Sequence, residues 1–163
     1  MRNHRWFPAA TVMAILAALL LAPGAGASPP VPAPINGTAT YAAGEVCPFP
    51  VRVKPVINKA ILHVLRNGTW VVTGRLTQSA TNLRTGASRT FKSGPLRIIF
   101  NEDGTLTFIS LGQVLWTSVE GDVDGPGLRL FTGHVVIQTS ADGFATSISR
   151  VHRIEDVCAE LAG

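Results

Sequence analysis

Two runs of apolar and β-branched residues, separated by Asn67-Gly68, set the pattern that most restricts how this chain can fold. Asn-Gly tolerates positive φ at both central positions of a two-residue type I′ turn, which most residues resist. The pattern therefore predicts a β-hairpin over residues 60–76 with a type I′ turn. Most of the chain that follows repeats the same order of strand, glycine-containing turn and strand.

Alternating apolar and polar residues continue this pattern toward the C-terminus. Residues 70–80 alternate as a strand with one wet face does. Gly94-Pro95 interrupts another strand pattern and predicts a bulge or sharp bend. A short helix is expected only near residues 155–161. The chain is therefore predicted to be all-β, an antiparallel meander of about 7–8 strands. It forms a closed or partly open β-barrel, with a two-sheet β-sandwich as the alternative.

The N-terminal residues have the composition of a secretory signal peptide. Two arginines and a histidine precede the apolar run of residues 9–22, and the small residues 25–27 follow. A membrane-spanning helix needs about 20 apolar residues, and this run is shorter and ends at Pro23-Gly24. Residues 1–27 are therefore predicted to be a signal peptide, and the protein is expected to be secreted to the extracellular side without a membrane span in the mature chain.

A proline-rich stretch follows the predicted signal peptide. Four prolines lie within residues 28–34, which favours an extended polyproline II spacer, so residues 28–37 are predicted to be a linker. Residues 38–163 have a length that suits one domain. Without residues 1–27 the chain has 12 basic and 10 acidic side chains, a net charge of +2. The basic residues are scattered, so no nucleic-acid partner is expected.

Cys47 and Cys158 are the only cysteines. An exported chain meets an oxidising environment, where an even number of cysteines favours a disulfide. The alternatives are a metal pair, for which further ligands are missing, or a redox thiol, for which no C-x-x-C exists. The predicted bond joins the first long strand to the C-terminal segment.

Several turn and cysteine motifs are similar to those of a group of small exported bacterial proteins. They comprise Val46-Cys47-x-Phe49-Pro50-Val51, residues 82–86, residues 93–95, residues 103–105 and residues 157–161. Together they resemble uncharacterised secreted proteins of actinobacterial type that have no assigned activity. The likeness extends over most of the mature chain and implies a secreted β-domain. It brings no catalytic residue with it.

Residues suited to catalysis or metal binding are few. His63 and His134 are the weak catalytic candidates, because a barrel interior could use either as an acid or base. No nucleophile motif is present. Glu120, Asp122 and Asp124 alternate in one loop, but they lack the full calcium-loop pattern and indicate a solvated acidic turn. No metal site and no cofactor is predicted.

The ligand-binding candidates are Trp70, Phe108, Trp116 and His134, which would line an apolar pocket, although aromatic residues also form ordinary cores. The leading hypothesis is an exported non-catalytic β-domain, expected to be monomeric. It would bind a small apolar ligand or an envelope or extracellular partner, and the loop 120–127 is the candidate surface for such a partner. The alternative is a small barrel enzyme of the cyclase or isomerase type that uses cavity histidines.

Overall fold

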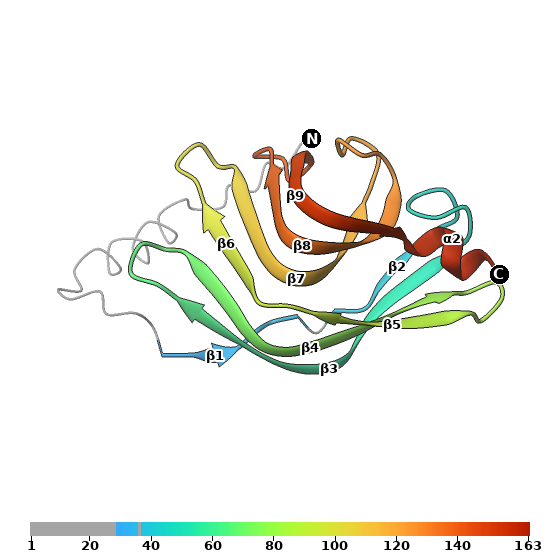
Figure 1. The fold of residues 1–163 in the computed structure, drawn as a ribbon, viewed down its shortest axis with the longest axis horizontal. Coiled ribbons are helices and arrows are strands. Elements are labelled where there is room, and N and C mark those ends of the chain that lie inside the picture. The colour runs from blue at the N-terminus through green and yellow to red at the C-terminus, as the bar shows by residue number, and fades with distance from the viewer. Residues whose placement is uncertain (1–28, 36) are drawn as a thin grey trace, which may run out of the picture.

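The computed structural model describes residues 29–35 and 37–163, and the predicted signal peptide lies outside this range. Nine antiparallel strands and a C-terminal helix make up this part of the chain (Figure 1). They are β1 (Val31–Pro32), β2 (Ala39–Tyr41), β3 (Val51–Val64), β4 (Trp70–Asn82), β5 (Ser88–Ser93), β6 (Leu96–Phe100), β7 (Leu106–Ser118), β8 (Gly127–Thr139), β9 (Ala145–Asp156) and α2 (Val157–Ala162). The predicted all-β meander with a short C-terminal helix is confirmed.

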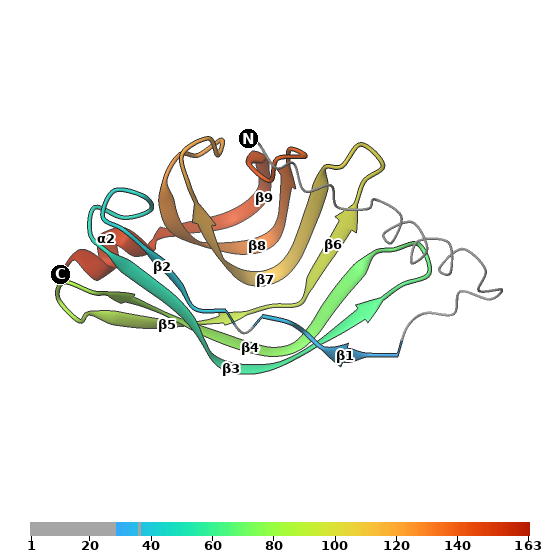
Figure 2. The same cartoon turned by 180° about the vertical axis from the view of Figure 1, so that it is seen from behind.

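The sheet is open, so the closed form of the predicted barrel is absent. Its strand order is β1-β3-β4-β6-β7-β8-β9, with β2 on β3 and β5 on β4, and β9 does not pair with β3. Figures 1 and 2 show β3, β4 and β5 as a shallow curve beneath β7, β8 and β9, which bend into a deeper U shape. The strand count exceeds the prediction because β1 and β2 are short segments added to β3.

The hairpin between β3 and β4 forms where it was predicted, but its turn differs. Gly68 has a φ of 79° and donates its N–H to the carbonyl of Leu65, while the N–H of Leu65 donates to Thr69. Asn67 does not have the positive φ that a type I′ turn requires. The type I′ prediction is therefore wrong, and the loop is the three-residue kind in which a turn is followed by a glycine bulge.

The same loop recurs at residues 101–105 and 140–144. In each, the glycine donates to the carbonyl three residues earlier, and the ends of the loop are joined by a second backbone bond. An Asn or Asp precedes the glycine in all three hairpins, and the carboxylate of Asp103 accepts the N–H of Thr105 at 3.0 Å. An Asn-Gly or Asp-Gly pair therefore suits the three-residue loop as well as the two-residue type I′ turn.

The break between β5 and β6 lies at Gly94-Pro95, as the sequence predicted. β5 pairs with Leu76–Thr81 of β4. β6 pairs with Trp70–Val72 of β4 on one side and with β7 on the other. Gly94 donates its N–H to the carbonyl of Gln113, and a Cβ on Gly94 would overlap the carbonyl oxygen of Leu111. The close approach of two backbones thus requires glycine here.

The buried side chains form three clusters. The first lies near α2 and contains Phe49, Phe91 and Leu130. The second lies on β3 and β4 around Leu62 and Val72. The third lies on β7, β8 and β9 and contains Phe131, Val135 and Ile137, with Phe108 and Trp116 packed against it.

Part of the segment predicted to be a linker is attached to the sheet. Val31 and Pro32 pair with Leu62 and Ile61 of β3. Ala33 is 1% exposed, and its N–H donates to the carbonyl of Ala60 at 2.9 Å. A proline-rich segment does not build a core of its own, but it can pair along the edge of an existing strand, where the missing N–H groups of proline face outward.

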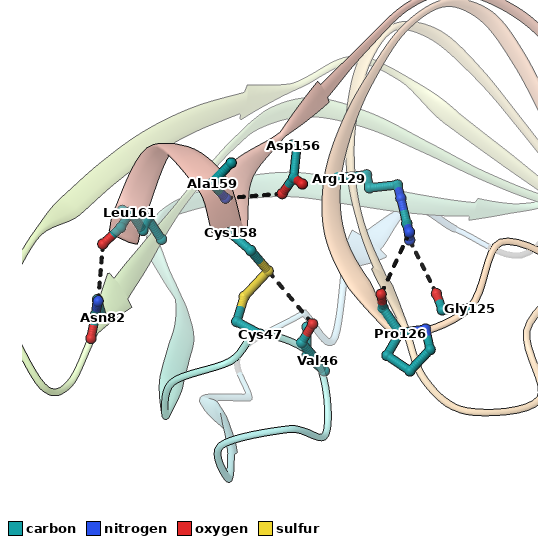
Figure 3. The surroundings of a disulfide bond; sticks show 10 residues. All are labelled: Val46, Cys47, Asn82, Gly125, Pro126, Arg129, Asp156, Cys158, Ala159 and Leu161. Carbon is teal, nitrogen blue, oxygen red and sulfur yellow. Dashed lines mark hydrogen bonds between the residues drawn. A yellow bond between two sulfur atoms is a disulfide. The ribbon is translucent and has the colours of Figure 1, made fainter. Parts of the chain in front are cut away.

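The predicted disulfide is present and closes one end of the molecule (Figure 3). Cys47, before β3, is joined to Cys158 in α2 with 5.4 Å between their Cα atoms. The amide of the buried Asn82 donates to the carbonyl of Leu161 at 2.9 Å, and the N-cap Asp156 accepts the N–H of Ala159 at 3.0 Å. The helix therefore bridges the two edges of the open sheet at this end.

Candidate functional site

The inner face of the sheet encloses an apolar cavity of about 180 Å³. Cross-strand pairing places Val72, Leu96, Ser110 and Val135 in one row across four strands, from β4 to β8. All four line the cavity, together with Phe108, Val114 and Trp116. Residues that are neighbours across paired strands therefore form one wall of the cavity.

Trp116 contributes the most distinctive polar group at this wall. Its ring lies edge-on to Phe108, with centroids 5.5 Å apart and an interplanar angle of 67°. The indole Nε1 is buried, and it has no hydrogen-bond partner in the described part of the chain. A buried indole N–H usually finds a partner, and leaving one unpaired costs about 1–3 kcal/mol.

Two other polar side chains at the wall have hydrogen-bond partners. The hydroxyl of Ser93 donates to Oε1 of Gln78 at 3.3 Å, and the hydroxyl of Ser110 donates to the carbonyl of Pro95 at 3.4 Å. Trp116 Nε1 is thus the buried side-chain donor at this wall that has no partner in the described part of the chain.

The structure brings together two of the four residues predicted to bind a ligand. Phe108 and Trp116 both line the cavity. Trp70 shares their face, but it packs against Phe100 with ring centroids 4.9 Å apart, toward the hairpin end of the sheet. His134 lies on the opposite, outer face, where it pairs with Leu111. The wall residues Val72, Leu96 and Val135 were not predicted, because simple alternation does not show which strands are neighbours.

The two catalytic candidates do not meet. His63 and His134 both lie on the outer face, on β3 and β8, with β4, β6 and β7 between them. Four strand spacings of about 4.8 Å separate these strands along the sheet. His63 Nε2 lies 3.2 Å from Oγ1 of Thr73, and His134 is exposed. The structure thus places neither histidine on the wall of the cavity.

The acidic loop between β7 and β8 is tied to its surroundings by its own carboxylates. Asp122 accepts the backbone N–H groups of Val119 at 2.7 Å and Ala145 at 2.5 Å. Asp124 pairs with Arg129 at 2.8 Å. Within residues 29–35 and 37–163, no group of three or more His, Cys, Asp or Glu side chains is arranged to hold a metal ion.

Glu155, a carboxylate outside the cavity, has a lowered pKa. The guanidinium of Arg89 donates to Glu155 at 2.7 Å and lowers the pKa of this carboxyl below its usual range, and the charge of Arg153 acts in the same direction. Arg89 also pairs with Glu160 of α2. This ion-pair group lies beside the disulfide-closed end and supports the helix there.

Comparison with known proteins does not assign the chain to a family. No family model, curated protein or solved structure matches the chain. In the region that the structure describes, no helix is long and apolar enough to cross a membrane.

Proposed function

We propose that this chain is an exported, non-catalytic β-domain that binds one small apolar molecule in the inner cavity. The observation that carries the proposal is the buried, unpaired indole N–H of Trp116, a residue that lines a largely apolar cavity. A bound molecule with one hydrogen-bond acceptor would pair this N–H and remove the cost of leaving it unsatisfied.

The size of the cavity restricts the ligand to a small molecule. An engineered protein cavity of about 150 Å³ accommodates benzene, and the cavity here is about 180 Å³. We therefore propose a molecule with a single ring, or a short branched chain, that carries one carbonyl or ether oxygen. The apolar wall would contribute hydrophobic binding, and the indole N–H would select the acceptor.

Export is part of the same proposal. The signal-peptide pattern of residues 1–27 and the Cys47–Cys158 disulfide both suit an oxidising compartment. The resemblance to secreted actinobacterial-type proteins agrees with this location. A disulfide-closed β-domain with an apolar cavity suits a role outside the cell, where such a molecule would be captured.

The test compares cyclohexanone with cyclohexane, which differ in the carbonyl acceptor. Cyclohexanone is expected to shift the Nε1–H resonance of Trp116 in two-dimensional NMR and to bind more tightly than cyclohexane. Trp116→Phe removes the donor and should reduce this preference roughly three- to tenfold, which corresponds to a hydrogen bond of about 1 kcal/mol.

Filling the cavity supplies the matched control. Val135→Phe places a larger side chain on the inner face, whereas Val136→Phe places the same side chain on the outer face. Binding should be lost in the first variant and kept in the second. The proposal would be refuted if wild type and Trp116→Phe showed the same preference for cyclohexanone over cyclohexane. Unchanged binding in a folded Val135→Phe protein would also refute it.

A further inference from the structure

A second concave surface lies on the outer face of the same sheet, spanning β4 and β6 to β9. This outer groove has a volume of about 770 Å³. Its floor is made of the apolar side chains of Val71, Ile109, Leu111 and Val136. Leu111 is 55% exposed, although it lies in the middle of a paired strand. No other element covers this apolar floor in the described chain.

The ionisable residues that border the outer groove are two arginines and one histidine. Arg97, His134 and Arg150 line it, and no Asp or Glu does. Among the described residues, none of these three side chains has a hydrogen bond or ion pair. By contrast, Arg89 and Arg129 each face a carboxylate. The outer groove thus combines an apolar floor with uncompensated positive charge.

Two of these groups meet at a β-bulge. The pairing of β8 with β9 moves from Gly133 opposite Val151 to Val136 opposite Ser149. His134 and Val135 therefore lie opposite the single residue Arg150. Arg97, on β6, lies two strand spacings from His134 and three from Arg150, about 10 and 14 Å along the sheet. The outer groove has a positive end at Arg150, beside the imidazole of His134, and its apolar floor runs from there toward Arg97.

The backbone of Arg150 is strained. Its φ of 57° is the only positive φ of a non-glycine residue in the described chain. This conformation costs a non-glycine residue about 1 kcal/mol or more, and such strain gathers at functional sites. A glycine would adopt the same bulge without that cost. An arginine at this position therefore points to a role for its side chain.

We propose that the outer groove binds a free aliphatic carboxylate, with the carboxylate between His134 and Arg150 and the hydrocarbon chain along the apolar floor. Guanidinium and carboxylate groups form charge-assisted, two-point hydrogen bonds, and the floor requires an apolar body. The volume of the outer groove exceeds that of the inner cavity more than fourfold. A long chain therefore fits outside and does not fit inside.

The test uses decanoate below its micelle concentration and the uncharged 1-decanol as the matched probe, with binding to the full chain measured by calorimetry. Decanoate should bind saturably and about tenfold more tightly than decanol. Arg150→Gly should lower decanoate affinity about tenfold and leave decanol binding unchanged. Glycine relieves the strain at this position, and denaturant unfolding of Arg150→Gly distinguishes loss of the carboxylate contact from loss of folding.

Two control variants establish whether decanoate binds in the outer groove. Arg75→Gln removes the same charge from an exposed residue of β4 that does not line the outer groove, and decanoate binding should be unchanged. Val135→Phe fills the inner cavity and should also leave it unchanged, so the two proposals can fail separately. The inference is overturned if decanoate does not bind, or if Arg150→Gly binds it as tightly as wild type does. It is also overturned if the chain binds vesicles that contain phosphatidylglycerol but does not bind free decanoate.

Discussion

Gly112 of β7 and Gly133 of β8 are direct cross-strand partners, and both have positive φ, 97° and 136°. Each is the central residue of its 13-residue strand. Figure 1 shows β7 and β8 curving into an arch along their length. A Cβ on Gly133 would lie 2.9 Å from the backbone N of His152. Glycine therefore lets the two strands bend together and admits the bulge at Arg150.

The close approach of β3 and β4 at Gly74 gives a stability prediction. A Cβ on Gly74 would lie 2.5 Å from the carbonyl oxygen of Lys59, whereas one on Gly44 would meet nothing within 4 Å. Their φ values are similar, 94° and 92°. Gly44→Ala should cost about 1 kcal/mol from its positive φ alone. Gly74→Ala should cost at least about 2 kcal/mol more in urea unfolding, and equal costs would contradict the predicted clash.

Reduction of the disulfide should destabilise the protein strongly. The bond closes a loop with a sequence separation of 111, and removing a native disulfide from a small exported domain typically costs about 2–5 kcal/mol. Cys47→Ala/Cys158→Ala and the reduced wild type should lose similar stability in thermal unfolding. A reductant should have no effect on the double variant, which is the control. An unchanged melting temperature after verified reduction would show that α2 holds without the bond.

The strain at Arg150 predicts a stabilising substitution. Arg150→Gly should raise the free energy of unfolding by about 1 kcal/mol, because glycine adopts a φ of 57° without steric cost. Arg150→Ala removes the same side chain and keeps the strain, so it serves as the control and should not gain stability. Denaturant unfolding of the two variants measures the difference. A less stable glycine variant would mean that the arginine side chain contributes more to folding than its backbone costs.

The Arg89–Glu155 pair predicts how stability depends on pH. Arg89 holds the pKa of Glu155 below its usual range, so the folded state binds the proton more weakly than the unfolded state. This contribution is present above the unfolded pKa of about 4.3 and is lost as the pH falls through the lower folded pKa. Wild type should therefore lose more melting temperature between pH 6 and pH 3 than Glu155→Gln. Parallel pH curves would show that the pair does not contribute.

The attachment of the proline-rich segment depends on Asn58. Its amide donates to the carbonyls of Ala33 at 3.2 Å and Ile35 at 3.1 Å, and Ile35 lines the inner cavity. Asn58→Ala should speed hydrogen exchange at the N–H of Ala33 at least tenfold while the exchange of Val72, inside β4, is unchanged. Uniformly faster exchange would instead indicate global destabilisation, and unchanged exchange would show that strand pairing alone holds the segment.

The candidate site was predictable only in part. Phe108 and Trp116 share the inner face because alternation within one strand is preserved in the structure. Trp70 has the same orientation, but Phe100 covers it, and a sequence does not show how far along the sheet a side chain will lie. His134 was predicted to face a cavity. It lies on the outer face because the pairing of β7 and β8 places Val135 and Ile137 inward.

The sequence by itself determined the longer strands, the positions of the glycine turns between them and the partner of each cysteine, because these depend on local alternation, on backbone freedom and on there being a single possible pair. Tertiary structure decided the pairing register, the curvature, the open edge at β9 and the two surfaces proposed to bind ligands. These features arise from contacts between strands far apart in the sequence, such as Gly112 with Gly133. Local pattern does not encode which distant strand will be the neighbour, or on which side of it a cavity will form.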